Sequence, residues 1–194
     1  MYDHAGNMYI SDEINSCVRV VAPDGIIYTF AGTCTVGGYS GDGGPAVSAR
    51  MNSPYQTAYS KGNMYIADTN NNAIRVVSMQ SGIISTFVGS STGGGGLVDG
   101  EGTNAYFNNP YGLIADHVGN LYVGDRNNNA VRMVTPEGVV STIAGHTGGQ
   151  GTSADGSAAY TALLSWPHGL ALDASGNLYI ANWVGNTISV VYRR

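Results

Sequence analysis

Short apolar runs separated by polar turns follow one another along the whole chain, and one order of runs and turns recurs four times. The clearest copy is GNMYIADTNNNAIRVV at residues 62–77, where two apolar runs flank an asparagine-rich stretch. Related segments begin at Gly6, Gly119 and Gly176, so the spacing between successive copies is 56 or 57 residues. A fixed period of this size is typical of propellers and solenoids built from one repeated unit.

Each repeat predicts four short β-strands. In the third repeat the apolar runs lie at 111–116, 121–125, 131–134 and 139–145, with turns rich in Gly, Asn or Pro between them. Such runs are too short and too often interrupted for helices, and tight turns between them indicate an antiparallel meander. The runs are continuous rather than alternating, which indicates burial on both faces, as in a sheet packed between two similar sheets. The sequence therefore predicts an all-β fold, a β-propeller of four-stranded antiparallel blades.

The repeat units span approximately 1–53, 54–109, 110–166 and 167–194, so we expect one propeller or propeller segment over residues 1–194. The first unit is expected to lack most of its first strand, and the last unit to lack its fourth. Three interpretations stay open: a piece of a longer propeller, which we favour, a small four-bladed ring with ragged ends, or open ends that pair with other copies.

Two charged positions recur seven residues apart on successive strands. They are Asp12 and Arg19, Asp68 and Arg75, and Asp125 and Arg132. An arginine within an apolar run needs a partner, because an unpaired buried charge is costly. We therefore expect a structural ion pair in three blades. The fourth repeat has Asn182 and Ser189 at these positions, so both partners are replaced together.

The connectors between repeats also share a pattern, from an Asp-Gly dipeptide to a proline. The aspartates are Asp42, Asp99 and Asp155, and a short helical turn is expected before the prolines Pro54, Pro110 and Pro167. An Asp-Gly dipeptide could indicate calcium binding, but one carboxylate per loop is few for an ion that takes about six to eight oxygen ligands. A turn-forming role is favoured.

The composition narrows the classes of function. The chain has 194 residues, 29 glycines, 11% charged residues and a formal net charge of −5, which argues against unspecific binding of nucleic acid. No run approaches the 18 to 20 or so apolar residues of a membrane span, so membrane insertion is not expected. Cys17 and Cys34 are the two cysteines, and a disulfide or two free thiols are both open. The composition and the two cysteines together favour an extracellular or cell-surface location.

The third repeat, FNNPYGLIADHVGNLYVGDRNNNAVRMVTPEGVVSTIAG, closely resembles the NHL repeat, and GYSGDGGPA is similar to connectors of NHL arrays in large secreted or surface proteins. The resemblance covers essentially the whole chain. It implies a β-propeller, usually of six blades, that binds proteins or, with a basic face, RNA. A related branch includes a zinc-dependent amidating lyase acting on peptidyl-hydroxyglycine. The segment PYQTAYSKGN in the second repeat departs from the family pattern.

The residue after each connector proline enters the innermost strand, so Tyr55, Tyr111 and His168 are the candidate partner-binding residues at the channel rim. A lyase-type zinc site needs several converging histidines, and only one falls here. The other histidines are His4, His117 and His146, which are scattered over turns and strand ends. No catalytic motif is present, so we expect no catalytic residues, no metal and no cofactor.

We therefore predict a non-enzymatic binding or structural module that presents its rim and loops to a protein or peptide, as a scaffold or part of a larger assembly. Self-association through incomplete terminal blades is a further expectation. The alternative is a metal-dependent lyase of the amidating type. The third hypothesis is an RNA-binding propeller. It is disfavoured because the eight basic residues are dispersed and do not form the basic surface that attracts RNA phosphates.

Overall fold

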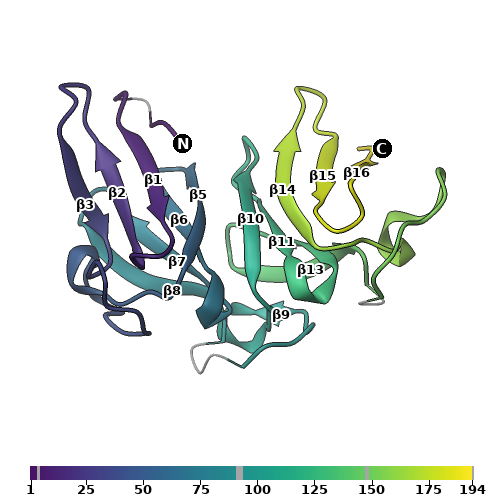
Figure 1. Ribbon diagram of the computed structural model, residues 1–194, viewed down its shortest axis with the longest axis horizontal. Helices are drawn as coiled ribbons and strands as arrows, with labels where there is room; N and C mark the ends of the chain where they lie inside the picture. The colour runs from purple at the N-terminus through teal and green to yellow at the C-terminus, as the bar shows by residue number, and fades with distance from the viewer. Residues whose placement is uncertain (4, 91–93, 147–148, 194) are drawn as a thin grey trace.

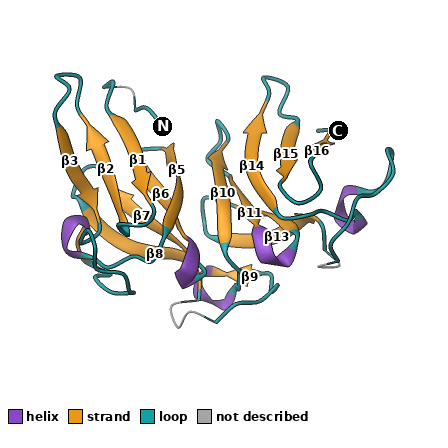
Figure 2. Cartoon of the chain, viewed as in Figure 1, coloured by secondary structure: helices purple, strands orange, loops and turns teal. Residues whose placement is uncertain are grey.

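A computed structural model describes residues 1–3, 5–90, 94–146 and 149–193. Four antiparallel sheets follow one another in chain order as the four blades of a β-propeller (Figure 1). Strands dominate, and the helices are single short turns (Figure 2). The predicted fold class, an all-β propeller with about four blades, is confirmed.

The blades are meanders whose strands follow each other in sequence. Blade 1 contains β1 (Met8–Asp12), β2 (Cys17–Val21) and β3 (Ile27–Ala31). Blade 2 contains β5 (Pro54–Ser60), β6 (Asn63–Asp68), β7 (Ala73–Ser78) and β8 (Ile83–Gly89). Blade 3 contains β10 (Pro110–Ala115), β11 (Leu121–Asp125), β12 (Ala130–Val134) and β13 (Val139–Ala144). Blade 4 contains β14 (Pro167–Leu172), β15 (Leu178–Asn182) and β16 (Thr187–Val191).

A two-residue strand from the preceding connector extends each of the two middle blades. These strands are β4 (Gly44–Pro45), which pairs with β8, and β9 (Gly100–Glu101), which pairs with β13. Short 3-10 turns lie in the connectors and after the second strands: η1 (Ala46–Ser48), η2 (Thr69–Asn71), η3 (Gly102–Asn104), η4 (Arg126–Asn128) and η5 (Ala159–Thr161). The turn expected in each connector is therefore present.

The core lies between consecutive blades, as the continuous apolar runs predicted. Five of the six residues of β6 are buried, so both faces of this strand are covered. One cluster joins blades 2 and 3 through Ile74, Leu113 and the connector residue Phe107. The equivalent connector residues Met51 and Leu164 are buried in the same way. Face-to-face packing thus explains why the runs do not alternate.

A close backbone approach ends the fourth strand of each complete meander. The residue before the third strand has a left-handed conformation, with φ of 55° at Ser16, 53° at Asn72 and 50° at Asn129. A Cβ atom on Gly89 would lie 2.5 Å from the Asn72 carbonyl oxygen, and one on Gly145 would lie 2.1 Å from that of Asn129. Only glycine fits this position, which accounts for its recurrence in the repeat.

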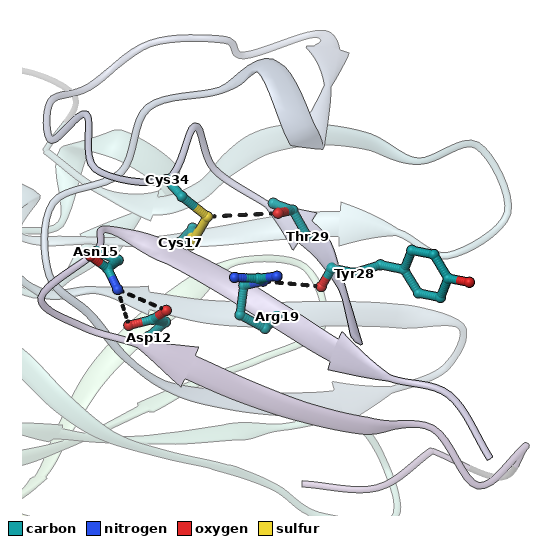
Figure 3. Close-up of a disulfide and its surroundings, with 7 residues drawn as sticks. All are labelled: Asp12, Asn15, Cys17, Arg19, Tyr28, Thr29 and Cys34. Carbon is teal, nitrogen blue, oxygen red and sulfur yellow. Dashed lines mark hydrogen bonds between the residues drawn. A yellow bond between two sulfur atoms is a disulfide. The ribbon is translucent and has the colours of Figure 1, made fainter. Parts of the chain in front are cut away.

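A disulfide joins Cys17 at the start of β2 to Cys34 in the connector after β3 (Figure 3). Cys17 is fully buried, and the Thr29 hydroxyl lies 3.6 Å from the Cys34 sulfur. The bond fixes the beginning of the long connector to blade 1. Of the two alternatives left open by the sequence, the structure has the bonded one.

Among the described residues, no helix is both long enough and apolar enough to cross a membrane.

Candidate functional site

Three rings meet at one end of the innermost strands. Pro54, Pro110 and Pro167 begin β5, β10 and β14, and the residue that follows each proline is Tyr55, Tyr111 or His168. The ring centroids are 4.1 Å apart for Tyr55 and Tyr111, 4.6 Å for Tyr111 and His168, and 4.9 Å for Tyr55 and His168. Sequence reasoning placed these residues around a rim, and the structure brings their rings into mutual contact.

Two tryptophans and an arginine extend this cluster. Trp183 stacks on His168 with a centroid distance of 5.0 Å, and the Arg126 guanidinium lies over Trp166 at 3.9 Å and over Tyr111 at 4.8 Å. We call Tyr55, Tyr111, Trp166, His168 and Trp183 the aromatic rim. Stacked rings with an arginine among them are typical of surfaces that bind partners.

Sequence reasoning missed Trp166, Trp183 and Arg126. A signal was present, because Arg126 and Trp183 each follow the last residue of a second strand, β11 or β15, and so share one position in the repeat. The chain has two tryptophans, and both lie in the rim. Mapping the repeat positions that vary in chemistry would therefore have found them.

The backbone at Trp166 is strained. This residue has a φ of 52°, a left-handed conformation that Ser53 and Asn109 adopt at the equivalent positions before β5 and β10. Asparagine tolerates that conformation, whereas a bulky side chain rarely adopts it. Strain of this kind persists at functional sites more often than elsewhere. The strained tryptophan therefore marks this end of the blades as a candidate binding site.

The exposed end of the rim borders a hollow. Trp183 is 64% exposed, although large aromatic side chains are mostly buried. Beside it lies a hollow of about 390 Å³ whose lining includes His168, Asn186 and Ile188. This space could accept a side chain of a partner stacked against the indole.

Exposed and half-buried asparagines form a hydrogen-bonded row at the same end of the blades. Asn70 donates to Asn52 at 3.3 Å, and Asn109 donates to Asn70 at 3.1 Å. Asn127 donates to Asn109 and, at 3.3 Å, to Asn108. Side-chain amides supply both donors and acceptors, which suits recognition of an extended backbone.

His168 is neutral at physiological pH, because burial and then the Arg126 charge lower its pKa below the usual value. The folded chain therefore binds this proton less readily than the unfolded chain does. The stabilising contribution is complete above about pH 6.5 and is lost as the pH falls through the lowered pKa.

We expect the wild type to lose more stability between pH 7 and pH 5 than His168→Phe, which keeps a ring but cannot be protonated. Urea unfolding at several pH values measures this difference. Equal slopes of unfolding free energy against pH in the two proteins would contradict the assignment.

Two buried arginines organise the middle blades. Arg75 donates to Asp68 at 3.2 Å and Arg132 donates to Asp125 at 2.9 Å, and all four side chains are fully buried. Burial raises the pKa of Asp68 and of Asp125 to about 6, against the opposing effect of their N–H donors and the arginines. Both carboxylates are therefore mainly ionised at neutral pH and can pair with the guanidinium groups.

The connector aspartates supply a second carboxylate to each arginine, which sequence reasoning missed. Arg75 also pairs with Asp42, and Arg132 pairs with Asp99 at 2.7 Å. For both aspartates burial raises the pKa, but hydrogen bonds and the arginine charge outweigh it and hold the pKa below its usual value. The Asp-Gly dipeptides thus anchor the connector to the following blade.

The pair expected between Asp12 and Arg19 is not formed. Asp12 accepts two hydrogen bonds from Asn15, at 2.9 and 3.0 Å, while Arg19 donates to the Tyr28 carbonyl at 3.3 Å (Figure 3). In the middle blades a preceding connector encloses the arginine and supplies a second carboxylate, and the described residues provide no such connector for blade 1. Arg19 is consequently only half-buried and does not need an ionic partner.

In blade 4 a neutral hydrogen bond replaces the ion pair. Asn182 donates to the Ser189 hydroxyl at 2.9 Å, so the paired replacement keeps a contact between the two strands. No buried charge is left alone there.

Over the described ranges, which omit His4, no group of three or more His, Cys, Asp or Glu side chains is placed to hold a metal ion. What the site offers is stacking surfaces, amide hydrogen bonds and one arginine.

Sequence comparison finds relatives that contain NHL repeats. The chain is 30% identical over 135 residues to NHL repeat-containing protein 2 of Bos taurus and 30% identical over 136 residues to that of Homo sapiens. Each match covers 66% of this chain and 18% of the relative, so the chain corresponds to a small part of those proteins. No family model matches the chain.

Solved structures share the fold. A protein of unknown function from Bacteroides thetaiotaomicron superimposes with a TM-score of 0.71 at 23% identity, over 94% of this chain and 43% of that one. A streptogramin B lyase structure superimposes with a TM-score of 0.64 at 12% identity, over 98% of this chain and 49% of that one. At these identities the likeness shows the fold alone. The sequence matches and the bladed fold together confirm the resemblance: this chain has NHL-type repeats folded as the blades of a β-propeller.

Proposed function

We propose that this chain is a non-enzymatic binding module whose aromatic rim binds an extended peptide segment of a protein partner. The NHL-type propeller fold supports a role as a binding or structural module. The aromatic rim favours peptide binding among these roles. The observation that carries the proposal is the contact of Tyr55, Tyr111 and His168 from three blades, extended by the exposed ring of Trp183.

The chemistry of this end of the molecule favours a peptide. Stacked aromatic side chains offer apolar area at a low cost in side-chain entropy, and the adjacent amide row can bond to a peptide backbone. The net charge of −5 disfavours RNA, which would need a basic surface. A lyase-type reaction finds less support, since the rim contains a single histidine.

The disulfide supports an oxidising compartment. A location outside the cell or on its surface is therefore part of this proposal, and so is a role in a larger assembly.

Selection from a random phage-displayed library of peptides on the immobilised chain tests the proposal. We expect selected peptides to bind Trp183→Ala about tenfold or more weakly than the wild type, because truncating an aromatic anchor that a partner covers typically costs more than 1 kcal/mol. Tyr160→Ala, which removes an exposed aromatic side chain outside the rim, is the matched control and should leave the affinity unchanged. Calorimetric titration gives the affinities.

The variant Trp166→Asn tests whether a loss of peptide affinity can occur without a loss of stability. Asparagine relieves the left-handed strain, so we expect stability to be retained while peptide affinity falls. Peptides that bind Trp183→Ala and Trp166→Asn as tightly as the wild type would overturn the rim as the binding site.

A further inference from the structure

Arg126 differs from the buried arginines of the middle blades because it has no acidic partner. Arg75 and Arg132 each pair with two carboxylates. Within the part of the chain that the structure describes, the Arg126 side chain makes no ion pair and no hydrogen bond, although it is half-buried. Removing a charge from water without a counter-ion costs stability, so a ligand that supplies one would gain the missing interaction.

Two aromatic rings hold the guanidinium group in place. It lies 3.9 Å from the ring centroid of Trp166 and 4.8 Å from that of Tyr111. Trp166 reaches it from a left-handed backbone position that Ser53 and Asn109 occupy in the other blades. Contacts between a cation and a ring face fix the position of a guanidinium group and leave its N–H groups free to donate.

The N–H groups at the end of the Arg126 side chain remain available. Nε is buried without a hydrogen-bond partner, and it is the only nitrogen of this side chain in that state, so the two Nη atoms are open to solvent. A planar guanidinium group with free N–H groups binds a carboxylate through parallel hydrogen bonds. Because the rings already hold the group, little further side-chain entropy is lost on binding. The arrangement is a preorganised receptor for a carboxylate.

A second charge gives the rim a polarity. The position directly after the second strand carries Glu13 in blade 1 and Arg126 in blade 3, and the two side chains form no ion pair with each other. Both charges act on Tyr55 in blade 2: burial and then the Tyr111 and Glu13 charges raise the pKa of its hydroxyl, and the Arg126 charge lowers it. The rim is therefore negative towards blade 1 and positive towards blade 3, where an acidic group of a partner is favoured.

The net charge of −5 does not prevent this contact. Exposed charges more than about 8 Å apart are largely screened at physiological ionic strength, so the guanidinium group dominates the field at its own edge. A nucleic acid requires many such cations along its backbone, whereas one side-chain carboxylate requires one. Charge complementarity thus favours an acidic residue of a peptide.

We infer that Arg126 determines the specificity of the aromatic rim by binding the carboxylate of an Asp or Glu side chain in the partner peptide. The inference rests on the proposed function, because the peptide that carries this residue is the one that the rim binds. An aromatic or apolar side chain next to the acidic residue lies against Trp183, which follows Tyr111 and His168 in the chain of stacked rings.

Two capped dipeptides test the inference: acetyl-Phe-Glu-amide, and acetyl-Phe-Gln-amide, which has a similar shape without the charge. Tryptophan fluorescence reports binding at the rim itself, because the two tryptophans of the chain both lie there. We expect the glutamate dipeptide to bind the wild type about fivefold more tightly at neutral pH, as for a partly exposed ion pair with good geometry.

Variants of the chain assign this preference to one residue. Arg126→Gln should bind the two dipeptides equally, because removing either charge removes the same contact. Arg126→Glu should reverse the preference and bind acetyl-Phe-Lys-amide more tightly than the glutamate dipeptide, which a merely structural arginine would not produce. Arg193→Gln is the matched control, since this exposed arginine lies beside Gly176 in the turn at the opposite end of blade 4 and should keep the fivefold preference.

Three results with the dipeptides would overturn the inference. One is equal binding of the glutamate and glutamine dipeptides to the wild type. Another is a preference for glutamate that survives in Arg126→Gln. The third is no binding of the glutamate dipeptide at concentrations up to about 20 mM, weaker than the millimolar dissociation constants of the weakest specific complexes.

The phage selection separates this inference from the proposed function. Peptides selected on the wild type should be enriched in Asp and Glu, and those selected on Arg126→Glu should be enriched in Lys and Arg. Selected peptides that weaken in Trp183→Ala but carry no excess of acidic residues would keep the rim as the binding site and refute the role of Arg126. Peptides that ignore both Trp183→Ala and Trp166→Asn would refute the proposed function, and this inference with it.

Discussion

Replacing Asp125 by alanine is expected to lower the free energy of unfolding by about 3 to 5 kcal/mol, because it leaves the buried Arg132 without its buried counter-ion. Asp125 also accepts hydrogen bonds from the Asn108 backbone at 2.7 Å and the Asn128 side chain at 2.8 Å, and both donors would lose their acceptor. The Asp99 carboxylate remains, but it is 45% exposed and compensates only in part. Urea denaturation measures the change.

The neutral Asn182–Ser189 pair of blade 4 is the model for a control variant of blade 3. The double variant Asp125→Asn with Arg132→Ser copies the Asn182–Ser189 contact into blade 3 and removes both buried charges together. We expect it to be more stable than Asp125→Ala, although a cavity remains where the arginine side chain was. Asp24→Ala should change the unfolding free energy by less than about 0.5 kcal/mol. A double variant as unstable as Asp125→Ala would show that charge pairing is not what the aspartate provides.

Removing the disulfide is expected to cost about 3 kcal/mol, the value for a closed loop of roughly 15 residues. Cys17 and Cys34 are 17 residues apart, and the bond restricts the unfolded chain over that length. The comparison is between the wild type and Cys17→Ala/Cys34→Ala, each unfolded with and without reductant. Reductant should destabilise the wild type to the level of the double variant and leave the variant unchanged.

The loss of stability after reduction should be largest near the disulfide. Cys34 begins the connector that carries Asp42, so we expect faster amide exchange in residues 35–43 than in blade 3 after reduction. A wild type whose stability does not respond to reductant would mean that the cross-link constrains little of the unfolded chain.

The repeat explains how much of the fold could be predicted. Contacts within one hairpin recur at a fixed spacing, so the pairs of Asp68 with Arg75 and Asp125 with Arg132 follow from the sequence. The second partners, Asp42 and Asp99, lie in a connector more than thirty residues away in sequence. Their pairing depends on how the connector folds back onto the next blade, which no local pattern specifies.

The rim was also predictable only in part. Tyr55, Tyr111 and His168 follow a visible landmark, the connector proline, whereas Trp183 lies just after β15, the strand paired with β14, and stacks on His168 there. That contact depends on side-chain directions across a blade. Arg19 shows the opposite case: the spacing is right, but the described residues include no connector that encloses this arginine, and the local pattern alone does not report that difference.

The ring contact between Tyr55 and His168 joins blades 2 and 4, which are not neighbours in the chain. A partner side chain that entered between these two rings would replace a contact that links the two blades at this end. Binding there and the spacing of blades 2 and 4 would then be thermodynamically linked.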